Sequence, residues 1–316
     1  MTPLLPVPVS DPPAETADEY RRAAYAPATA RAYTADLRDF ASWLQTQGRT
    51  FVASERPSSE DVAEYLAFLA RHGTKVSTIR RRVATLGRVY HFSLRRDPVI
   101  GPVLAGIERT HGVRQQGKDA LLLEDLAKVL EGVPEDGNLL HIRDRAIVLL
   151  GFAGAFRRSE LAALEYSDLQ FREEGLLIRI QKSKTDQTGA GRVLGIPFGS
   201  SEGTCPVRAL RRWMEEAVIK NGPVFRRVYA GKHVGQELEP QAIWHVIRRL
   251  CAKAGLDPKR FGAHSLRAGM VTQAIRGGAS DHAIMAQTGH KSSDMIRRYR
   301  GETDVFRDNA AGKLGL

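Results

Sequence analysis

The chain has 316 residues, which fits two domains of ordinary size better than one. Hydrophobic residues make up 42% of it and charged residues 26%, proportions typical of a globular protein with hydrophobic cores. The formal net charge of +11 at pH 7 is high for such a composition and points to an acidic partner, for which nucleic acid is the commonest choice. The alternative is a basic face that is only solvated.

The sequence argues against several other classes of protein. It has two cysteines, Cys205 and Cys251, and no Cys/His cluster with zinc-ligand spacing, so we expect neither a disulfide framework nor a zinc site. Its N-terminus lacks the basic and apolar regions of a signal peptide, and no apolar run is long enough to span a membrane. We therefore expect a cytoplasmic protein with no membrane partner.

The N-terminal part is predicted to be a tail followed by a helical domain. Five prolines fall within the first thirteen residues, so residues 1–26 are expected to form a disordered tail. Apolar residues at three- and four-residue intervals then predict helices over residues 27–48, 59–71 and 77–94. Together they predict a helical domain over residues 27–108.

The third of these helices carries charge of one sign. Residues 75–96 contain seven basic side chains and no acidic one, whereas a solvated helix usually mixes both signs because i,i+4 pairs stabilise it. Like charges on one face repel each other unless phosphates neutralise them. We therefore predict DNA contacts here, with a merely solvated surface as the alternative. The candidate DNA-binding residues are Lys75, Arg80, Arg81, Arg82 and Arg88.

The second part of the chain is predicted to be mixed. Prolines and glycines interrupt the helical pattern after residue 96, and the polar segment 109–119 is predicted to link to a second domain over residues 120–316. Two alternating runs, 176–181 and 192–197, predict a β-hairpin. Helices are predicted over residues 123–130, 138–156, 205–220, 241–254, 264–276, 281–288 and 293–299. The expected fold class is mainly α with a small antiparallel β-sheet.

Four short segments of this second part carry groups that could act on a phosphate. They are AFRRSEL at 155–161, KSKT at 182–185, HSLR at 264–267, and GH at 289–290 with a tyrosine nine residues later. Taken singly, each is common as a capped helix end, a surface pair or a packed ring. Two histidines without a carboxylate make a poor metal site, so we expect no metal.

Taken together, these segments supply what metal-free attack on a phosphodiester requires. Guanidinium groups bind phosphate oxygens bidentately and offset the charge that builds up in phosphoryl transfer. A tyrosine hydroxyl ordinarily has a pKa of about 10, so it needs a nearby base or a polarised phosphate. A lysine on a hairpin tip can protonate the departing oxygen. A covalent tyrosyl intermediate keeps the energy of the phosphodiester bond, so we expect no ATP or other cofactor.

The order Arg, Lys, His-x-x-Arg, Gly-His, Tyr resembles the signature of the tyrosine site-specific recombinases, the phage integrase family, over roughly residues 27–305. The resemblance implies a helical core-binding (SAM-like) domain and a mixed α+β catalytic domain. It also implies which residues act in catalysis. They are Arg157, Lys184, His264, Arg267, His290 and Tyr299, with Glu160 as the supporting acid and Lys182 as a weaker candidate for the lysine.

The resemblance also implies a reaction. Tyr299 would attack a phosphate to give a 3′-phosphotyrosine and a free 5′-hydroxyl, while the two arginines and His290 hold the phosphate oxygens. His264 would help with proton transfer at the tyrosine, Lys184 would protonate the leaving oxygen, and Glu160 would orient its neighbours. A homotetramer on two double-stranded DNA sites, each a short inverted repeat, would then exchange strands through a Holliday junction.

Two other functions remain open at this point. A type IB topoisomerase-like enzyme would use a similar site, and a DNA-binding relative could keep the fold without cutting. The separate helical domain favours a recombinase over the first, and the complete signature favours it over the second. The resemblance places such an enzyme in the cytoplasm at the nucleoid, with a bacterial, phage or mobile-element origin.

Overall fold

The computed structural model describes residues 16, 24–113, 117–181, 191–300 and 314. Contacts divide the chain into two compact units, Met1–Gln116 and Gly117–Leu316. Within the described ranges, no helix is both long and apolar enough to cross a membrane.

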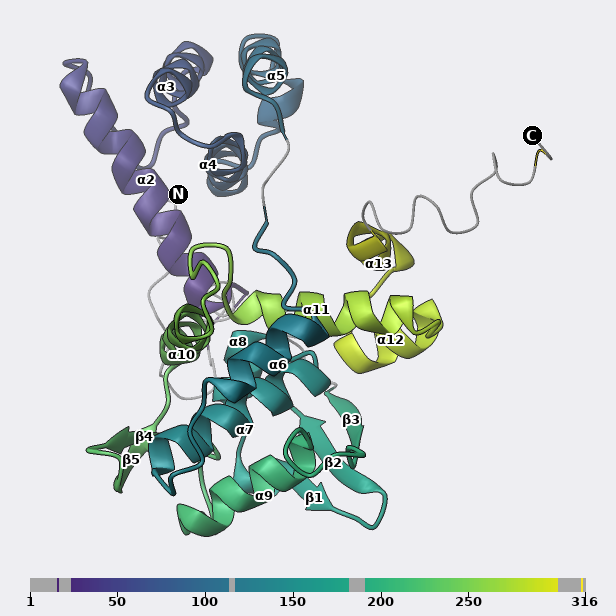
Figure 1. The fold of residues 1–316 in the computed structure, drawn as a ribbon. Helices are drawn as coiled ribbons and strands as arrows, with labels where there is room; N and C mark the ends of the chain where they lie inside the picture. The colour runs from purple at the N-terminus through teal and green to yellow at the C-terminus, as the bar shows by residue number, and fades with distance from the viewer. Residues whose placement is uncertain (1–15, 17–23, 114–116, 182–190, 301–313, 315–316) are drawn as a thin grey trace. The chain divides into compact units, whose positions relative to one another are not determined.

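The first unit is a bundle of helices around one apolar core (Figure 1). Its core is built from fully buried side chains such as Phe40, Tyr65 and Ile79. Its elements are α2 (Pro27–Thr46), α3 (Ser59–Arg71), α4 (Val76–Val89), a 3-10 turn (Leu94–Arg96) and α5 (Ile100–His111). The helices predicted from apolar spacing are therefore present, although α4 ends earlier than expected.

Helix α5 was not predicted, because Pro102 and two glycines argued against a helix there. Pro102 occupies the first turn of α5, where a missing backbone N–H breaks no intrahelical hydrogen bond. Asp97 Oδ1 accepts hydrogen bonds from the backbone N–H groups of Val99 (3.0 Å) and Ile100 (3.1 Å), which satisfies donors at the helix start. The predicted linker segment 109–119 therefore begins inside a helix.

The second unit is helical with small antiparallel sheets, which confirms the predicted fold class (Figure 1). Strands β1 (Leu169–Phe171), β2 (Gly175–Ile180) and β3 (Arg192–Pro197) form one antiparallel sheet, and β4 (Arg226–Tyr229) pairs with β5 (His233–Glu237). The predicted hairpin is β2–β3. The short strands β1, β4 and β5 were not predicted.

Within this unit, α7 packs against α9, α10 and α11, and its residues 142–144 and 146–151 are all buried. The helices are α6 (Leu123–Glu131), α7 (Leu139–Ala153), α8 (Arg158–Ala162), α9 (Pro206–Glu216), α10 (Pro240–Lys253), α11 (Ala263–Arg276), α12 (Asp281–Thr288) and α13 (Ser293–Arg300), with a 3-10 turn at Tyr166–Asp168.

Helix α11 is held close to its neighbours because it carries a glycine at the contact. A Cβ on Gly269 would lie 1.9 Å from the carbonyl oxygen of Leu121, so only glycine fits there. The Leu121 amide in turn donates to the Ser265 carbonyl at 2.9 Å. The close approach fixes the helix that carries the predicted His264 and Arg267.

Helices α12 and α13 are attached to α11 through a small separate cluster. Its buried members are Val271 of α11, Ile284 of α12 and Ile296 of α13. An ion pair between Arg300 and Asp281 (2.6 Å) also joins α13 to α12. The helix that carries Tyr299 is therefore anchored outside the main core of the unit.

Candidate active site

Arg157 and Glu160 begin the site at the start of α8. Glu160 Oε2 accepts a hydrogen bond from the Arg157 backbone N–H (3.0 Å), and Oε1 accepts one from its guanidinium Nη1 (2.5 Å). The Glu160 side chain is only 1% exposed, whereas that of Arg157 is 17% exposed. The carboxylate is therefore a buried support, and the arginine keeps some access to solvent.

A third arginine, which the sequence did not predict as a site residue, binds the same carboxylate. Arg192 is the first residue of β3, and its Nη2 donates to Glu160 Oε2 at 3.0 Å. Its Nη1 donates to the carbonyl of Gln287 at 3.1 Å, near the end of α12. The signal was available, because Arg192 alternates with the buried Leu194 and Ile196 and so shares their face of the strand.

Arg267 is the most deeply buried cation of the site, at 1% exposure. Its Nη1 donates to the carbonyl of Ala155 at 2.7 Å, which ties α11 to the segment before α8. Among the described residues, its Nη2 is buried without a hydrogen-bond partner. Burial, and then the charge of Arg157, lower the pKa of Arg267 to about 10. A buried donor of this kind is suited to a phosphate oxygen.

Tyr299 and His264 lie next to each other in the site. The Tyr299 hydroxyl lies 3.2 Å from Nε2 of His264, within hydrogen-bond distance. Burial and the charges of Arg267 and Arg157 lower the pKa of His264, which favours the neutral ring. A neutral imidazole nitrogen facing a hydroxyl can accept its proton.

His290 completes the cluster from the turn after α12. Gly289 ends that helix in the left-handed conformation (φ +67°), which glycine adopts without strain and which turns the chain toward the site. The His290 ring is 6% exposed and packs against Tyr299, with 5.8 Å between ring centroids. Burial, followed by the charges of Arg267 and Arg157, lowers its pKa to about 4.

These groups form a site for an anion. Three arginines and one carboxylate give a formal charge of +3 − 1 = +2 over Arg157, Arg192, Arg267 and Glu160. A phosphate diester would offset part of this excess and supply acceptors for the arginine donors. Within the described ranges, no group of three or more His, Cys, Asp and Glu side chains is placed to hold a metal ion.

The predicted hairpin lysine, Lys184, and its weaker alternative, Lys182, both lie outside the described residues. The strands that flank them are β2 and β3, which pair with Ile180 opposite Arg192. The other five predicted catalytic residues are brought together within one unit.

The predicted DNA-binding residues of the first unit do not form a free basic face. Arg80 donates to Glu108 of α5 (2.6 Å), Arg81 binds Asp36 of α2, and Arg82 donates to Asp39 of α2 (2.5 Å). The acidic side chains that offset the positive charge of α4 lie on neighbouring helices. Counting charges along α4 alone therefore misses them.

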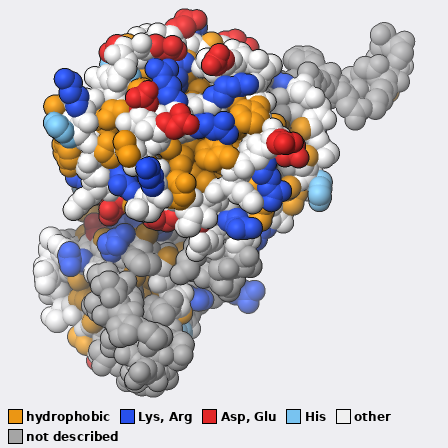
Figure 2. Space-filling model, turned by 90° about the horizontal axis from the view of Figure 1, so that it is seen from below, with side chains coloured by type: hydrophobic (Ala, Val, Ile, Leu, Met, Phe, Trp, Pro, Cys, Tyr) orange, Lys and Arg blue, Asp and Glu red, His pale blue; other side chains and the backbone are white. Residues whose placement is uncertain are grey.

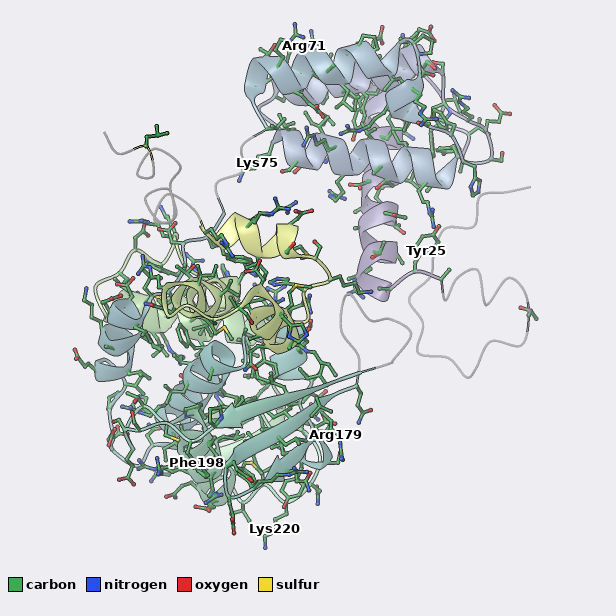
Figure 3. All side chains as sticks on the ribbon, turned by 90° about the vertical axis from the view of Figure 1, so that its right-hand side faces the viewer. Tyr25, Arg71, Lys75, Arg179, Phe198 and Lys220 are labelled. Carbon is green, nitrogen blue, oxygen red and sulfur yellow. The ribbon has the colours of Figure 1, made fainter. Side chains whose placement is uncertain are left out.

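Two of the predicted residues have different surroundings. Arg88 donates to the hydroxyl of Tyr25 at 3.2 Å, so its partner is a phenol and not an acid. Lys75 is exposed at the start of α4, where Figure 3 shows it near the end of α3, which carries Arg71. The structure thus distinguishes three arginines that are paired with acids on neighbouring helices, Arg80, Arg81 and Arg82, from Lys75 and Arg88.

Comparison with known proteins identifies the class to which this fold and site belong. The model of the phage integrase family matches residues 121–304, and that of the phage integrase N-terminal SAM-like domain matches residues 20–97. The chain belongs to the phage integrase family and is a tyrosine site-specific recombinase.

Particular relatives agree with this class. An integrase/recombinase XerD homolog of Selenomonas ruminantium is 35% identical over 294 residues, covering 90% of this chain and 85% of that protein. Tyrosine recombinase XerD of Bifidobacterium longum is 24% identical and covers 87% of this chain and 86% of that protein.

Solved structures share the fold. The XerH site-specific recombinase bound to palindromic difH substrate has a TM-score of 0.63 at 18% identity, covering 91% of this chain and 81% of that one. A dimer of a lambda integrase fragment (75–356) bound to a COC′ core site has a TM-score of 0.57 at 16% identity, covering 90% of this chain and 93% of that fragment.

Proposed function

We propose that this recombinase cleaves and rejoins double-stranded DNA through a 3′-phosphotyrosine at Tyr299, without metal or ATP. The observation that carries the proposal is the 3.2 Å contact between the Tyr299 hydroxyl and His264 Nε2. It lies beside an arginine cluster in which Arg267 Nη2 is buried and has no hydrogen-bond partner among the described residues. A nucleophile, a base and an anion site are thus adjacent, as phosphoryl transfer requires.

In the proposed reaction the Tyr299 oxygen bonds to phosphorus while its proton passes to His264. Arg157, Arg267 and His290 hold the non-bridging oxygens. The bond from phosphorus to the 5′-oxygen breaks, and Lys184 supplies the proton that this oxygen takes. A 5′-hydroxyl from the partner site then attacks the phosphotyrosine and gives its proton to Lys184. The bond from phosphorus to the Tyr299 oxygen breaks, this oxygen takes back its proton from His264, and the new strand is joined without outside energy.

The proposal extends to the assembly and its location. Residues 27–108 act as the core-binding domain, residues 120–316 as the catalytic domain, and residues 109–119 as the link between them. Four copies bind two short inverted repeats and exchange strands through a Holliday junction. Lys75 and Arg88 contribute phosphate contacts, and Arg80, Arg81 and Arg82 do so only where they exchange their acidic partners for phosphate. We place the enzyme at the nucleoid in the bacterial cytoplasm, encoded by the host, a phage or a mobile element.

Covalent trapping tests the proposal. Wild type and Tyr299→Phe are incubated with fragmented DNA of the source organism, and SDS-resistant adducts are isolated and sequenced. Tyr166→Phe serves as the control, because Tyr166 is an exposed tyrosine (41%) in a 3-10 turn of the same unit. We expect adducts from wild type and from the control only, enriched at one inverted repeat.

Other outcomes favour other functions. Adducts from Tyr299→Phe would move the nucleophile to another residue. Salt-sensitive DNA binding with no adducts from any of the three proteins would favour a DNA-binding relative that no longer cuts. Relaxation of a supercoiled plasmid without joining of two sites would favour a topoisomerase-like enzyme.

A further inference from the structure

Thr288, the last residue of α12, lies beside His290 and has no part in the proposed chemistry so far. Its side chain is fully buried, and its Oγ1 lies 2.6 Å from the carbonyl oxygen of Ile284 and 2.9 Å from Nδ1 of His290. The backbone N–H of His290 also approaches the same oxygen, at 3.4 Å. The hydroxyl is therefore at the centre of three polar contacts.

Thr288 has only one hydroxyl proton to donate, and this determines which ring nitrogen of His290 carries a hydrogen. A carbonyl oxygen can only accept, so the single hydroxyl proton of Thr288 is donated to Ile284. Thr288 Oγ1 can then act toward His290 only as an acceptor, and Nδ1 must carry a hydrogen to bond to it. In the neutral ring, Nε2 is consequently without a hydrogen.

We propose that Thr288 is a positioning residue for DNA cleavage: it holds His290 as the Nδ1–H tautomer, so that Nε2 can donate to the phosphate only after the ring takes up a proton. This inference deepens the role of His290 in the proposed function and rests on it. The proton comes from solvent and becomes the Nε2–H that bonds to a phosphate oxygen.

The charges around the ring explain why proton uptake accompanies phosphate binding. Among the described residues, the charged groups that lower the pKa of His290 are all cationic or become so when protonated, so the free site opposes an imidazolium. A phosphate diester placed among these groups offsets part of their positive charge and supplies an acceptor for an Nε2–H, and both effects favour the protonated ring. The groups around His290 are Arg157, which precedes α8, Arg192 of β3, His264 and Arg267 of α11, and Tyr299 of α13.

Nitrogen NMR on the full-length protein tests the tautomer directly. Protein labelled with ¹⁵N-histidine is studied near pH 7 without DNA, and the His290 signals are assigned by their loss in His290→Asn. We expect a protonated Nδ1 and an unprotonated Nε2 in wild type. Thr288→Ser, which keeps the hydroxyl, is expected to retain this pattern, whereas Thr288→Val, which keeps the shape, is expected to shift the population toward Nε2–H.

Two results would overturn the inference: a wild-type ring with the hydrogen on Nε2, or a pattern that Thr288→Val leaves unchanged. If the valine variant fails to fold, wild type and Thr288→Ser still decide, because both must show Nδ1–H. The measurement requires no DNA cleavage. A wrong tautomer therefore leaves the nucleophile role of Tyr299 intact, and failed trapping of adducts leaves the tautomer result intact.

Discussion

Arg192 Nη2 donates to Glu160 Oε2 at 3.0 Å and thereby joins the first residue after the hairpin loop to the helix that follows Arg157. Glu160 thus serves two arginines at once, and its own side chain is 1% exposed. A carboxylate buried between cations orients both of them and reduces their mutual repulsion. This pair links the hairpin that carries the predicted lysine to the arginine that is expected to bind the phosphate.

Removing the charge of Glu160 should destabilise the catalytic unit. In Glu160→Gln, Arg157 and Arg192 lose their shared anion while Arg267 remains close, so we expect a loss of about 3 kcal/mol in the free energy of unfolding. Urea unfolding of the full chain measures it. The control is Glu239→Gln, which breaks an exposed pair with Arg227 and should cost less than about 1 kcal/mol. Equal losses of unfolding free energy in the two variants would contradict a stabilising role for the buried Glu160 carboxylate.

Arg157→Ala should slow the formation of the covalent adduct without abolishing DNA binding. Loss of a single transition-state donor costs about 3 kcal/mol in other enzymes, or roughly 10²-fold in rate. Single-turnover trapping on the site identified by sequencing gives the rate. Arg158→Ala is the matched control, since Arg158 is adjacent, exposed and bonded to Gln241. A rate for Arg157→Ala within a few-fold of the control would exclude Arg157 from catalysis.

The free protein should lose stability as the pH falls below 7. The pKa of His290 is lowered from 6.5 to about 4 in the folded state, so the unfolded chain binds a proton first as the pH falls. The stability that this group contributes is present above pH 6.5 and is lost between there and pH 4. The loss at pH 5 should be about 2 kcal/mol.

Comparison of variants isolates this contribution. Urea unfolding at pH 7 and pH 5 should show a smaller difference for His290→Gln than for wild type. His233→Gln, which changes an exposed histidine of β5, should behave as wild type does. A wild-type pH dependence in His290→Gln would assign the effect to other groups, among which His264 also has a lowered pKa.

The cations of the first unit should separate into two kinds. Lys75→Ala should weaken DNA binding and reduce the slope of log affinity against log salt by about 1, because one phosphate contact is lost. Arg82→Ala should mainly destabilise the bundle, because Arg82 donates to Asp39 and to the hydroxyl of Tyr65 (2.6 Å). Fluorescence anisotropy across a salt series and urea unfolding measure the two effects.

Lys220→Ala is the control for the salt series. Lys220 is exposed beyond the end of α9, at the end of the catalytic unit opposite α13 (Figure 3). The face of this unit seen from below mixes basic and acidic side chains with hydrophobic ones, unlike a one-sign DNA surface (Figure 2). A slope change in Lys220→Ala as large as that in Lys75→Ala would show that the assay reports net charge and not a contact.

The sequence was most informative where one periodicity or one motif decides the structure. Apolar spacing predicted α3 at its observed bounds and the β2–β3 hairpin. The motif order predicted six catalytic residues, and the structure brings together the five of them that it describes. Helix α5 was missed because Pro102 argues against a helix unless its place in the first turn is known.

Two side chains of the site were missed. Thr288 is only two residues from His290, and it was missed although this contact is local. Arg192 was missed because its ion pair with Glu160, 32 residues away in the sequence, depends on how β3 meets α8. The balance of charge on α4 was misjudged for the same reason, since Asp36 and Glu108 are distant in sequence. A sequence pattern predicts which face of a helix or strand a residue lies on. Which residue of another element it pairs with depends on how the elements pack together.

The separate anchoring of α13 has a consequence for dynamics. A short helix held by Ile296 and the Arg300–Asp281 pair can undergo local unfolding at a lower free energy than α7, which is buried along most of its length. In native-state hydrogen exchange, the amides of α13 should lose protection well before those of α7. Local unfolding of α13 would move the Tyr299 hydroxyl away from the site while the arginines keep their positions. The site could then bind a phosphate without being able to cleave the DNA strand.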